Sequence, residues 1–298
     1  MQLQPISYED LEEITEIARR TLVYDKITRE VIAEKIFDEP RYRPEHAMKA
    51  ILHERIAAFM VGHVSVRNGR KVAWIKFFAT RPEFRRLGAA KTLLADLEQK
   101  FRAEAVEQIR TLDCPPNYLS AGIDPRYTEA VALFTRRGYR REDENFDMIC
   151  SLDRNFSTQD EEDRLRSMGL TVGRLADEDR PSLFELVRTH WPGWLYECER
   201  AIENSPCSVH VALDGKRIVA FSAYEGNNRG TGWFGPMGTD PEYRGKRIGE
   251  VLLKRCLADL RGLGHSQAII PWVGPLYFYL NTVGARVSRV LWVYVRDI

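Results

Sequence analysis

Two short stretches of the chain combine basic side chains with small residues at the start of a predicted helix. "RPEFRRLGAAKTLL" begins at Arg81, and "DPEYRGKRIGEVLL" begins at Asp240, 159 residues later. Each follows a strand-like run that ends at a threonine, Thr80 or Thr239. The first N–H groups of a helix lack partners within the helix, and glycine or alanine lets a ligand approach them closely. We therefore expect an anion site at both turns, suited to a pyrophosphate and flanked by arginine and lysine side chains.

The repeat extends beyond these turns and divides the chain into two similar halves. The same offset of 159 residues joins Trp74 with Trp233 and Phe84 with Tyr243. The chain of 298 residues is about twice the commonest domain size. We predict an N-terminal domain at 1–155, a charged linker at 156–168 and a C-terminal domain at 169–298.

Each half is expected to contain the same elements in the same order. A short strand leads into an amphipathic helix, at residues 10–22 and 179–190, whose N-terminal turn is acidic. A hairpin follows, indicated in the second half by the Asp214-Gly215 pair. A strand, the basic turn, a helix, a strand, a helix and a last strand complete each half, which predicts an α+β fold. The first half also carries a long Pro-rich loop at 114–127, expected to cover a pocket or to pack between the domains.

Composition excludes several broad classes of function. The 44 basic and 43 acidic side chains give a net charge of +1, so no overall field attracts nucleic acid or an anionic membrane. No apolar run reaches the roughly 18 residues of a membrane span, and the acidic N-terminal stretch is unlike a secretory signal. The five cysteines are scattered without a Cys-x-x-Cys pair, which favours a reducing, cytoplasmic location. The six histidines show no ligand spacing, so we predict no metal site.

At the two basic turns the chain resembles the GNAT superfamily of acyl-CoA-dependent N-acyltransferases. The family signature, Arg/Gln-x-x-Gly-x-Gly/Ala at a helix start, is matched fully in the first half and with Arg247 in place of a glycine in the second. The resemblance covers nearly the whole chain as two tandem units, the arrangement of mycothiol synthase-like enzymes. It implies two tandem GNAT domains of α/β type, each a mixed, mostly antiparallel sheet flanked by helices.

The resemblance also implies acetyl-CoA as the cofactor and assigns its binding residues. In the first half these are Ala79, Thr80, Arg85, Arg86, Leu87, Gly88, Ala89 and Ala90. In the second half they are Met237, Gly238, Thr239, Arg244, Gly245, Lys246, Arg247, Ile248 and Gly249. The end of the strand before each turn is expected to present backbone donors to the developing oxyanion.

The family's usual acid is a tyrosine about four residues before a glycine, and here the halves differ. The first half has Phe134 at that position, which cannot donate a proton, whereas the second has Tyr279 five residues before Gly284. We therefore predict Tyr279 as the catalytic acid, the alternative being an aromatic core residue. Glu225 is the candidate general base, and its alternative is a solvated loop carboxylate.

These inferences predict an N-acetyltransferase that moves an acetyl group from acetyl-CoA to a primary amine of a small-molecule or peptide acceptor. The amine would attack directly in a ternary complex, with the second half as the catalytic one. Nucleic acid and membrane are not expected as partners. Two alternatives remain open: a non-catalytic acyl-CoA-binding or sensing protein, and another acyl or aminoacyl transferase on the same double fold.

Overall fold

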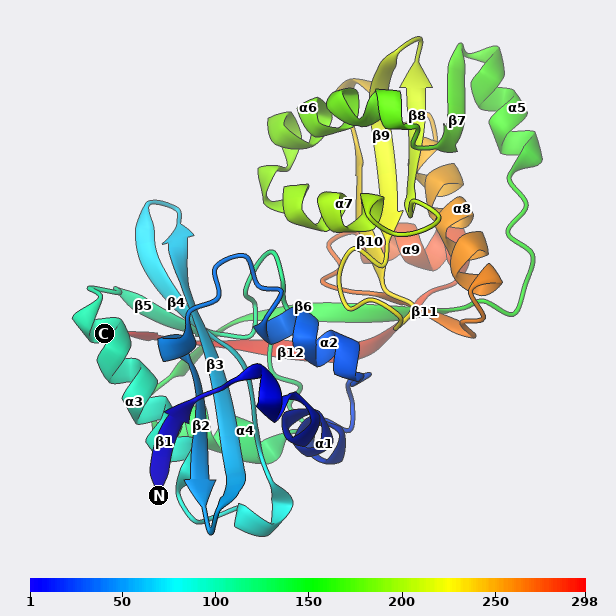
Figure 1. Ribbon diagram of the computed structural model, residues 1–298. Helices are drawn as coiled ribbons and strands as arrows, with labels where there is room; N and C mark the ends of the chain where they lie inside the picture. Colours follow the sequence, from blue (N-terminus) through cyan, green and yellow to red (C-terminus); the bar gives the residue numbers. More distant parts are fainter. The chain divides into compact units, whose positions relative to one another are not determined.

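The computed structural model describes residues 1–298, which form two compact units (Figure 1). The first unit contains residues 1–145 and 290–298, and the second contains residues 146–289. None of the helices in either unit has the length and apolar character that crossing a membrane requires.

The first unit is built on a mixed sheet with the strand order β1-β2-β3-β4-β5-β12. Its strands are β1 (Gln2–Pro5), β2 (Ala47–Leu52), β3 (Arg55–Arg67), β4 (Arg70–Thr80), β5 (Gln108–Thr111) and β12 (Arg286–Asp297). Neighbouring strands are antiparallel except for the parallel pair β4 and β5. The hairpin between β3 and β4 turns through Asn68 and Gly69, both with positive φ, as tight two-residue hairpins require.

Helices cover both faces of this sheet. They are α1 (Leu11–Thr21), α2 (Arg29–Ile36), α3 (Ala89–Ala103) and α4 (Thr128–Arg136). Ile17 of α1 packs in one core cluster with Phe77, whereas Leu97 of α3 packs in another with Ile75. Ile75 and Phe77 would share a face of a regular strand, but an extra residue, Lys76, interrupts the pairing of β4 with β3. Because of this β-bulge, the side chains that follow Lys76 face the opposite side of the sheet from the one that a regular strand would give them, just before the basic turn.

The second unit repeats this plan. Its strands are β7 (Leu170–Arg174), β8 (Val209–Asp214), β9 (Arg217–Tyr224), β10 (Phe234–Thr239), β11 (Gln267–Ile270) and β6 (Arg140–Ser151). The strands β7 to β10 pair antiparallel in that order, and β11 pairs antiparallel with β6. A single parallel bridge, Trp233 to Ile269, connects the β10 and β11 regions. The helices are α5 (Gln159–Ser167), α6 (Arg180–His190), α7 (Leu195–Ile202), α8 (Ile248–Gly262) and α9 (Leu276–Val283).

The two units therefore have equivalent strand orders, and their last strands are exchanged. The strand β12 ends the second half of the sequence but pairs with β5 in the first unit. The strand β6 ends the first half of the sequence, and its residues from Met148 to Ser151 pair with β11 in the second unit. The expected fold class, two tandem domains with mixed, mostly antiparallel sheets and flanking helices, is confirmed. The boundaries at 155 and 169 follow the sequence repeat, whereas the compact units follow the strand pairing.

Candidate functional site

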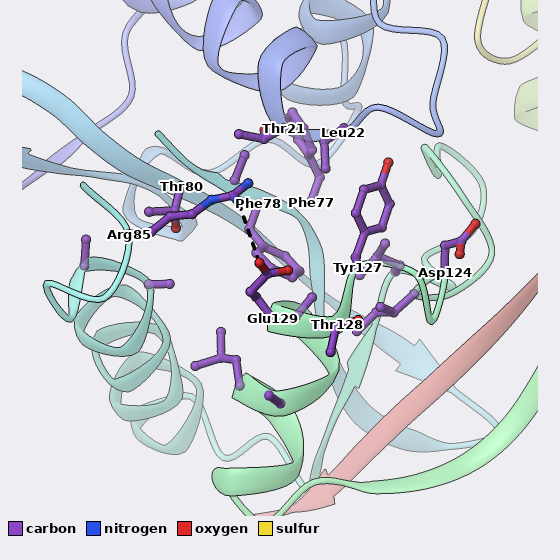
Figure 2. Close-up of a pocket in the computed structure, with 18 of the residues that line it drawn as sticks. Thr21, Leu22, Phe77, Phe78, Thr80, Arg85, Asp124, Tyr127, Thr128 and Glu129 are labelled. Carbon is purple, nitrogen blue, oxygen red and sulfur yellow. Dashed lines mark ion pairs between the residues drawn. The ribbon is translucent and has the colours of Figure 1, made fainter. Parts of the chain in front are cut away.

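A pocket of about 900 Å³ lies in the first unit, where β4 and β5 separate. The strand β4 pairs with β5 only from Val72 to Ile75. From there to Thr80 it pairs with β3 along one edge, and no strand pairs with its other edge, which we call the free end of β4. The free end of β4, the basic turn, the start of α4 and the end of α1 line the pocket (Figure 2). The Pro-rich loop contributes six further residues to the lining: Leu119, Ser120, Gly122, Ile123, Asp124 and Tyr127.

The predicted first-half cofactor residues converge on this pocket. All of them line it except Leu87, whose side chain is exposed. The N–H of Thr92 makes the first bond of α3, to the carbonyl oxygen of Gly88 at 2.9 Å. The N–H groups of residues 89–91 therefore have no acceptor within the helix, as an anion site at a helix N-terminus requires.

The basic turns of the two units share one backbone conformation. In the first, Arg86 and Gly88 have φ values of 66° and 87°. In the second, Gly245 and Arg247 at the equivalent positions have φ values of 81° and 59°. Each turn thus places one glycine and one arginine in the left-handed region, in opposite order. The departure from the family signature at Arg247 leaves the shape of the turn intact.

The charge at the first turn of the following helix differs between the units. The first turn of α3 has no acidic residue and carries Lys91. At the equivalent place α8 carries Glu250, which accepts hydrogen bonds from Arg247 at 2.7 Å and Lys254 at 2.9 Å. Burial acts to raise the pKa of Glu250, but the hydrogen bonds and positive charges of Arg247 and Lys254 together outweigh it, and the pKa lies below its usual value. The ionised carboxylate already occupies the positive end of α8, so the turn of the first unit is the better anion site.

In the second unit, side chains fill the space around the end of β10, the strand that precedes the basic turn. A Cβ built at Gly249 would lie 3.0 Å from Cε of Met237 and 3.7 Å from Cζ of Phe278. On the opposite face, a Cβ at Gly238 would lie 2.5 Å from the Trp191 ring. The strand bulge is present here too, but Pro236 takes the place of Phe77 and has no N–H to offer. The predicted second-half cofactor residues therefore lie next to one another around the basic turn. The side chains of Met237 and Phe278 lie in the space through which a ligand would reach this turn.

An ion pair spans the pocket of the first unit. Arg85 of the basic turn lies 3.6 Å from Glu129 in the first turn of α4, and both side chains are exposed (Figure 2). Because exposed pairs of this kind contribute little energy, an anionic ligand can displace Glu129 from Arg85.

Phe134 is fully buried on α4. Its ring makes edge contacts with Phe78 at 5.5 Å and Tyr139 at 5.0 Å between centroids. It is therefore part of the core beneath the pocket and offers no proton to it.

Tyr279, the predicted acid, is buried in the core of the second unit. Its ring makes edge contacts with Phe234 and Phe278, and burial raises the pKa of its hydroxyl. A phenol with a raised pKa is a weaker acid, which does not favour proton donation near neutral pH. The role of Tyr279 stays a prediction.

Glu225, the predicted base, closes the loop after β9. Its carboxylate accepts hydrogen bonds from the backbone N–H groups of Gly230 and Gly232, and His265 Nε2 lies 3.4 Å from Oε1. These contacts give Glu225 a structural task in the loop, and its catalytic role likewise stays a prediction.

Sequence reasoning missed the acidic and phenolic groups at the other end of the first unit's pocket. Asp25, Asp124 and Tyr127 line it there, from the loop after α1 and the loop before α4. Arg126 binds Asp124 at 2.9 and 2.6 Å, and Tyr127 binds Asp25 at 2.7 Å. The only signal in the sequence was the length of the Pro-rich loop, which ends at Tyr127.

Comparison with known proteins agrees with this arrangement. The model of the Acetyltransferase (GNAT) family matches the chain twice, at residues 11–139 and 174–274. A search of curated protein sequences found no match.

Several solved structures have the same tandem fold at low sequence identity. The GCN5-related glucosamine N-acetyltransferase region of a fungal multi-domain β-N-acetylglucosaminidase matches 99% of this chain, with TM-score 0.80 and 18% identity. The match spans 38% of that longer protein. A GCN5-related N-acetyltransferase from Sphaerobacter thermophilus has TM-score 0.71 and 16% identity, covering 99% of this chain and 95% of its own. A tandem GNAT protein from the clavulanic acid pathway has TM-score 0.66 and 14% identity, covering 99% and 98%. With both halves matching one family model, the chain belongs to the GNAT family of acetyltransferases.

Proposed function

We propose that the protein is an N-acetyltransferase that moves an acetyl group from acetyl-CoA to a primary amine of a small-molecule or peptide acceptor. We further propose that the first unit binds the acyl donor. The observation that carries this proposal is the pocket of about 900 Å³ that joins the open N-terminus of α3 to the free end of β4. Membership of the GNAT family supports an acyl-CoA donor.

The residues of the first unit fit such a donor. The N–H groups at the start of α3, with Arg85, Arg86 and Lys91, suit the diphosphate. Apolar side chains of the lining, including Phe78 and Leu133, suit the uncharged arm. Bound acyl-CoA supplies a thioester, which is an acyl group already activated toward amines.

The free end of β4 would serve the transfer through its backbone. Beyond the bulge at Lys76, β4 pairs with β3 but no longer with β5, and Phe78, Ala79 and Thr80 of this segment line the pocket. Backbone donors fixed at this place can stabilise a developing oxyanion without reorganising. An alkyl amine with a pKa near ~10.4 is mostly protonated at neutral pH, so a group in the pocket must also take a proton.

A second candidate function is acyl-CoA binding without turnover. Phe134 favours it, because this buried ring stands where the resembling family has its tyrosine acid. In that case the protein would bind acetyl-CoA and release no free CoA with any amine.

Steady-state release of free CoA, measured with a thiol reagent and a panel of primary amines, tests the proposal. Lys91→Glu puts a carboxylate at the first turn of α3, where α8 carries Glu250. Because this carboxylate would repel the diphosphate, we expect the KM for acetyl-CoA to rise about tenfold or more. Glu250→Lys is the matched control in α8 and should leave that KM within about twofold. A larger effect of Glu250→Lys than of Lys91→Glu would overturn the assignment to the first unit.

A further inference from the structure

One face of α4 extends the pocket of the first unit away from the basic turn. Glu129, Leu133 and Arg136 line the pocket, and their spacing of four and three residues places them on one face of the helix. Glu129 begins this face beside Arg85, at 3.6 Å (Figure 2). Arg136 follows Glu129 by seven residues, about 10 Å along the helix axis. The pocket therefore has a positive group that is separate from the basic turn.

Arg136 and its neighbour Arg137 have different surroundings. Arg137 also lines the pocket, but its guanidinium pairs with the buried carboxylate of Glu98 and so connects α4 to α3. The side chain of Arg136 is exposed in the last turn of α4 and makes no ion pair or hydrogen bond with another side chain. A ligand can therefore bind the Arg136 guanidinium without displacing a protein partner.

The second unit has no equivalent of this cation. The helices α4 and α9 are followed by Gly138 and Gly284, both with positive φ, which gives a common point for comparing them. Two residues before the glycine, α4 has Arg136 and α9 has Thr282. The whole of α9, with the sequence LYFYLNTV, has no charged side chain. Of the two equivalent helices, only α4 carries the cation, and it belongs to the unit with the open anion site.

Coenzyme A carries its negative charge in two places. Its diphosphate joins the arm to the nucleotide, and a third phosphate is bound to the 3′ oxygen of the ribose, so a single sugar ring separates the two. With the diphosphate at the start of α3 and the arm along the end of β4, the nucleotide must continue away from β4. Figure 2 shows α4 running in that direction from Glu129. Arg136, near the far end of α4, is the unpaired cation of the lining there.

We propose that Arg136 binds the 3′-phosphate of the donor's nucleotide, so that the site selects coenzyme A thioesters over donors that lack this phosphate. This inference rests on the proposed function, because it takes the diphosphate to lie at the start of α3. A guanidinium can bind two phosphate oxygens at once through charge-assisted hydrogen bonds, which makes such a contact strong. Arg136 lies away from the end of β4, where the thioester would react, so it acts on donor affinity and not on the chemical step.

Calorimetric titration with two ligands, CoA and 3′-dephospho-CoA, isolates this contact. We expect wild type to bind CoA about tenfold more tightly than 3′-dephospho-CoA. Arg136→Gln should weaken the binding of CoA about tenfold and leave the Kd of 3′-dephospho-CoA within about twofold, so that the preference disappears. Because Arg136 is exposed, the substitution should not disturb folding, and the retained affinity for 3′-dephospho-CoA reports an intact pocket.

Arg102 provides a matched control. It is an exposed arginine in the last turn of α3 without an ion pair, but it does not line the pocket. Arg102→Gln removes the same charge and should leave the preference for CoA unchanged. If wild type binds both ligands equally, if Arg136→Gln keeps the preference, or if Arg102→Gln removes it as well, the inference is wrong and the proposed donor site stands. Failure of wild type to bind either ligand would instead contradict the proposed function, together with this inference.

Discussion

At the scale of single residues, Phe134 and Tyr127 show what the sequence could and could not predict. The absence of a proton donor at Phe134 follows from the residue type alone. The partnership of Tyr127 with Asp25 joins positions 102 residues apart and depends on how the loop after α1 meets the loop before α4. No local pattern encodes such a contact, so only the fold revealed it.

Behind the strand bulge lies a buried polar cluster that the sequence did not indicate either. Lys76 at the bulge pairs with Glu39, and Nδ1 of His63 lies 4.0 Å from Glu39. All three side chains are buried, and Nε2 of His63 has no hydrogen-bond partner. Burial lowers the pKa of His63 to about 4, although the charge of Glu39 acts in the opposite direction.

This environment predicts a pH-dependent stability. Because the folded-state pKa of His63 lies below the unfolded value near ~6.5, the unfolded chain binds a proton first as the pH falls. The free energy of unfolding should therefore fall by about 2 kcal/mol between pH 7 and pH 5 on account of His63. Urea unfolding of His63→Gln should show a correspondingly shallower pH dependence, since glutamine does not titrate. Equal slopes for the variant and wild type would refute this prediction.

At the scale of elements, local pattern predicted most of what the structure contains. The helices expected at 10–22 and 179–190 are α1 and α6, and the Asp214-Gly215 turn does join β8 to β9. Apolar periodicity and turn residues act over a few positions, which explains this success. The filled end of β10 could not be predicted, because it depends on Trp191 reaching Gly238 from another element.

The shared conformation of the two basic turns gives a stability prediction. Arg247 adopts φ 59°, a left-handed conformation that disfavours side chains other than glycine. Arg247→Gly should therefore raise the free energy of unfolding of the second unit by about 1 kcal/mol. Gly88→Ala, at the equivalent position with φ 87°, should destabilise the first unit by a similar amount.

Thermal unfolding of both variants provides the check. Arg247→Gly also removes the ion pair of Arg247 with Glu250, which acts against the gain in stability. Because the Arg247 side chain is 67% exposed, loss of this ion pair should cost little free energy. A lower midpoint for Arg247→Gly would mean that this ion pair outweighs the backbone strain.

At the scale of the whole molecule, the duplication was readable from the sequence and the strand exchange was not. The repeat at an offset of 159 residues predicted two domains of one family. However, β6 and β12 are the last strands of the two halves of the sequence. The hydrophobic pattern of either strand therefore fits the last position of either sheet. The pairing of β12 with β5 and of β6 with β11 is a non-local choice that periodicity does not record.

The exchange predicts that core substitutions near the end of each half weaken the opposite unit. Tyr294 of β12 packs in the core of the first unit, with its ring 6.5 Å from that of Phe134. Met148 of β6 packs in the core of the second unit. Each substitution to alanine should cost about 2–5 kcal/mol locally. Hydrogen exchange should accelerate in β5 for Tyr294→Ala and in β11 for Met148→Ala, and the reverse assignment would contradict the exchanged pairing.

The central claim is that the chain binds one acyl donor, at the basic turn of the first unit. Calorimetric titration with acetyl-CoA tests it most directly, on wild type and on two variants at equivalent positions, Ala90→Glu and Gly249→Glu. Each variant adds a carboxylate at the first turn of α3 or α8. We predict one site per chain, lost in Ala90→Glu and retained in Gly249→Glu. Two sites, loss of binding only in Gly249→Glu, or no binding by wild type would contradict the claim.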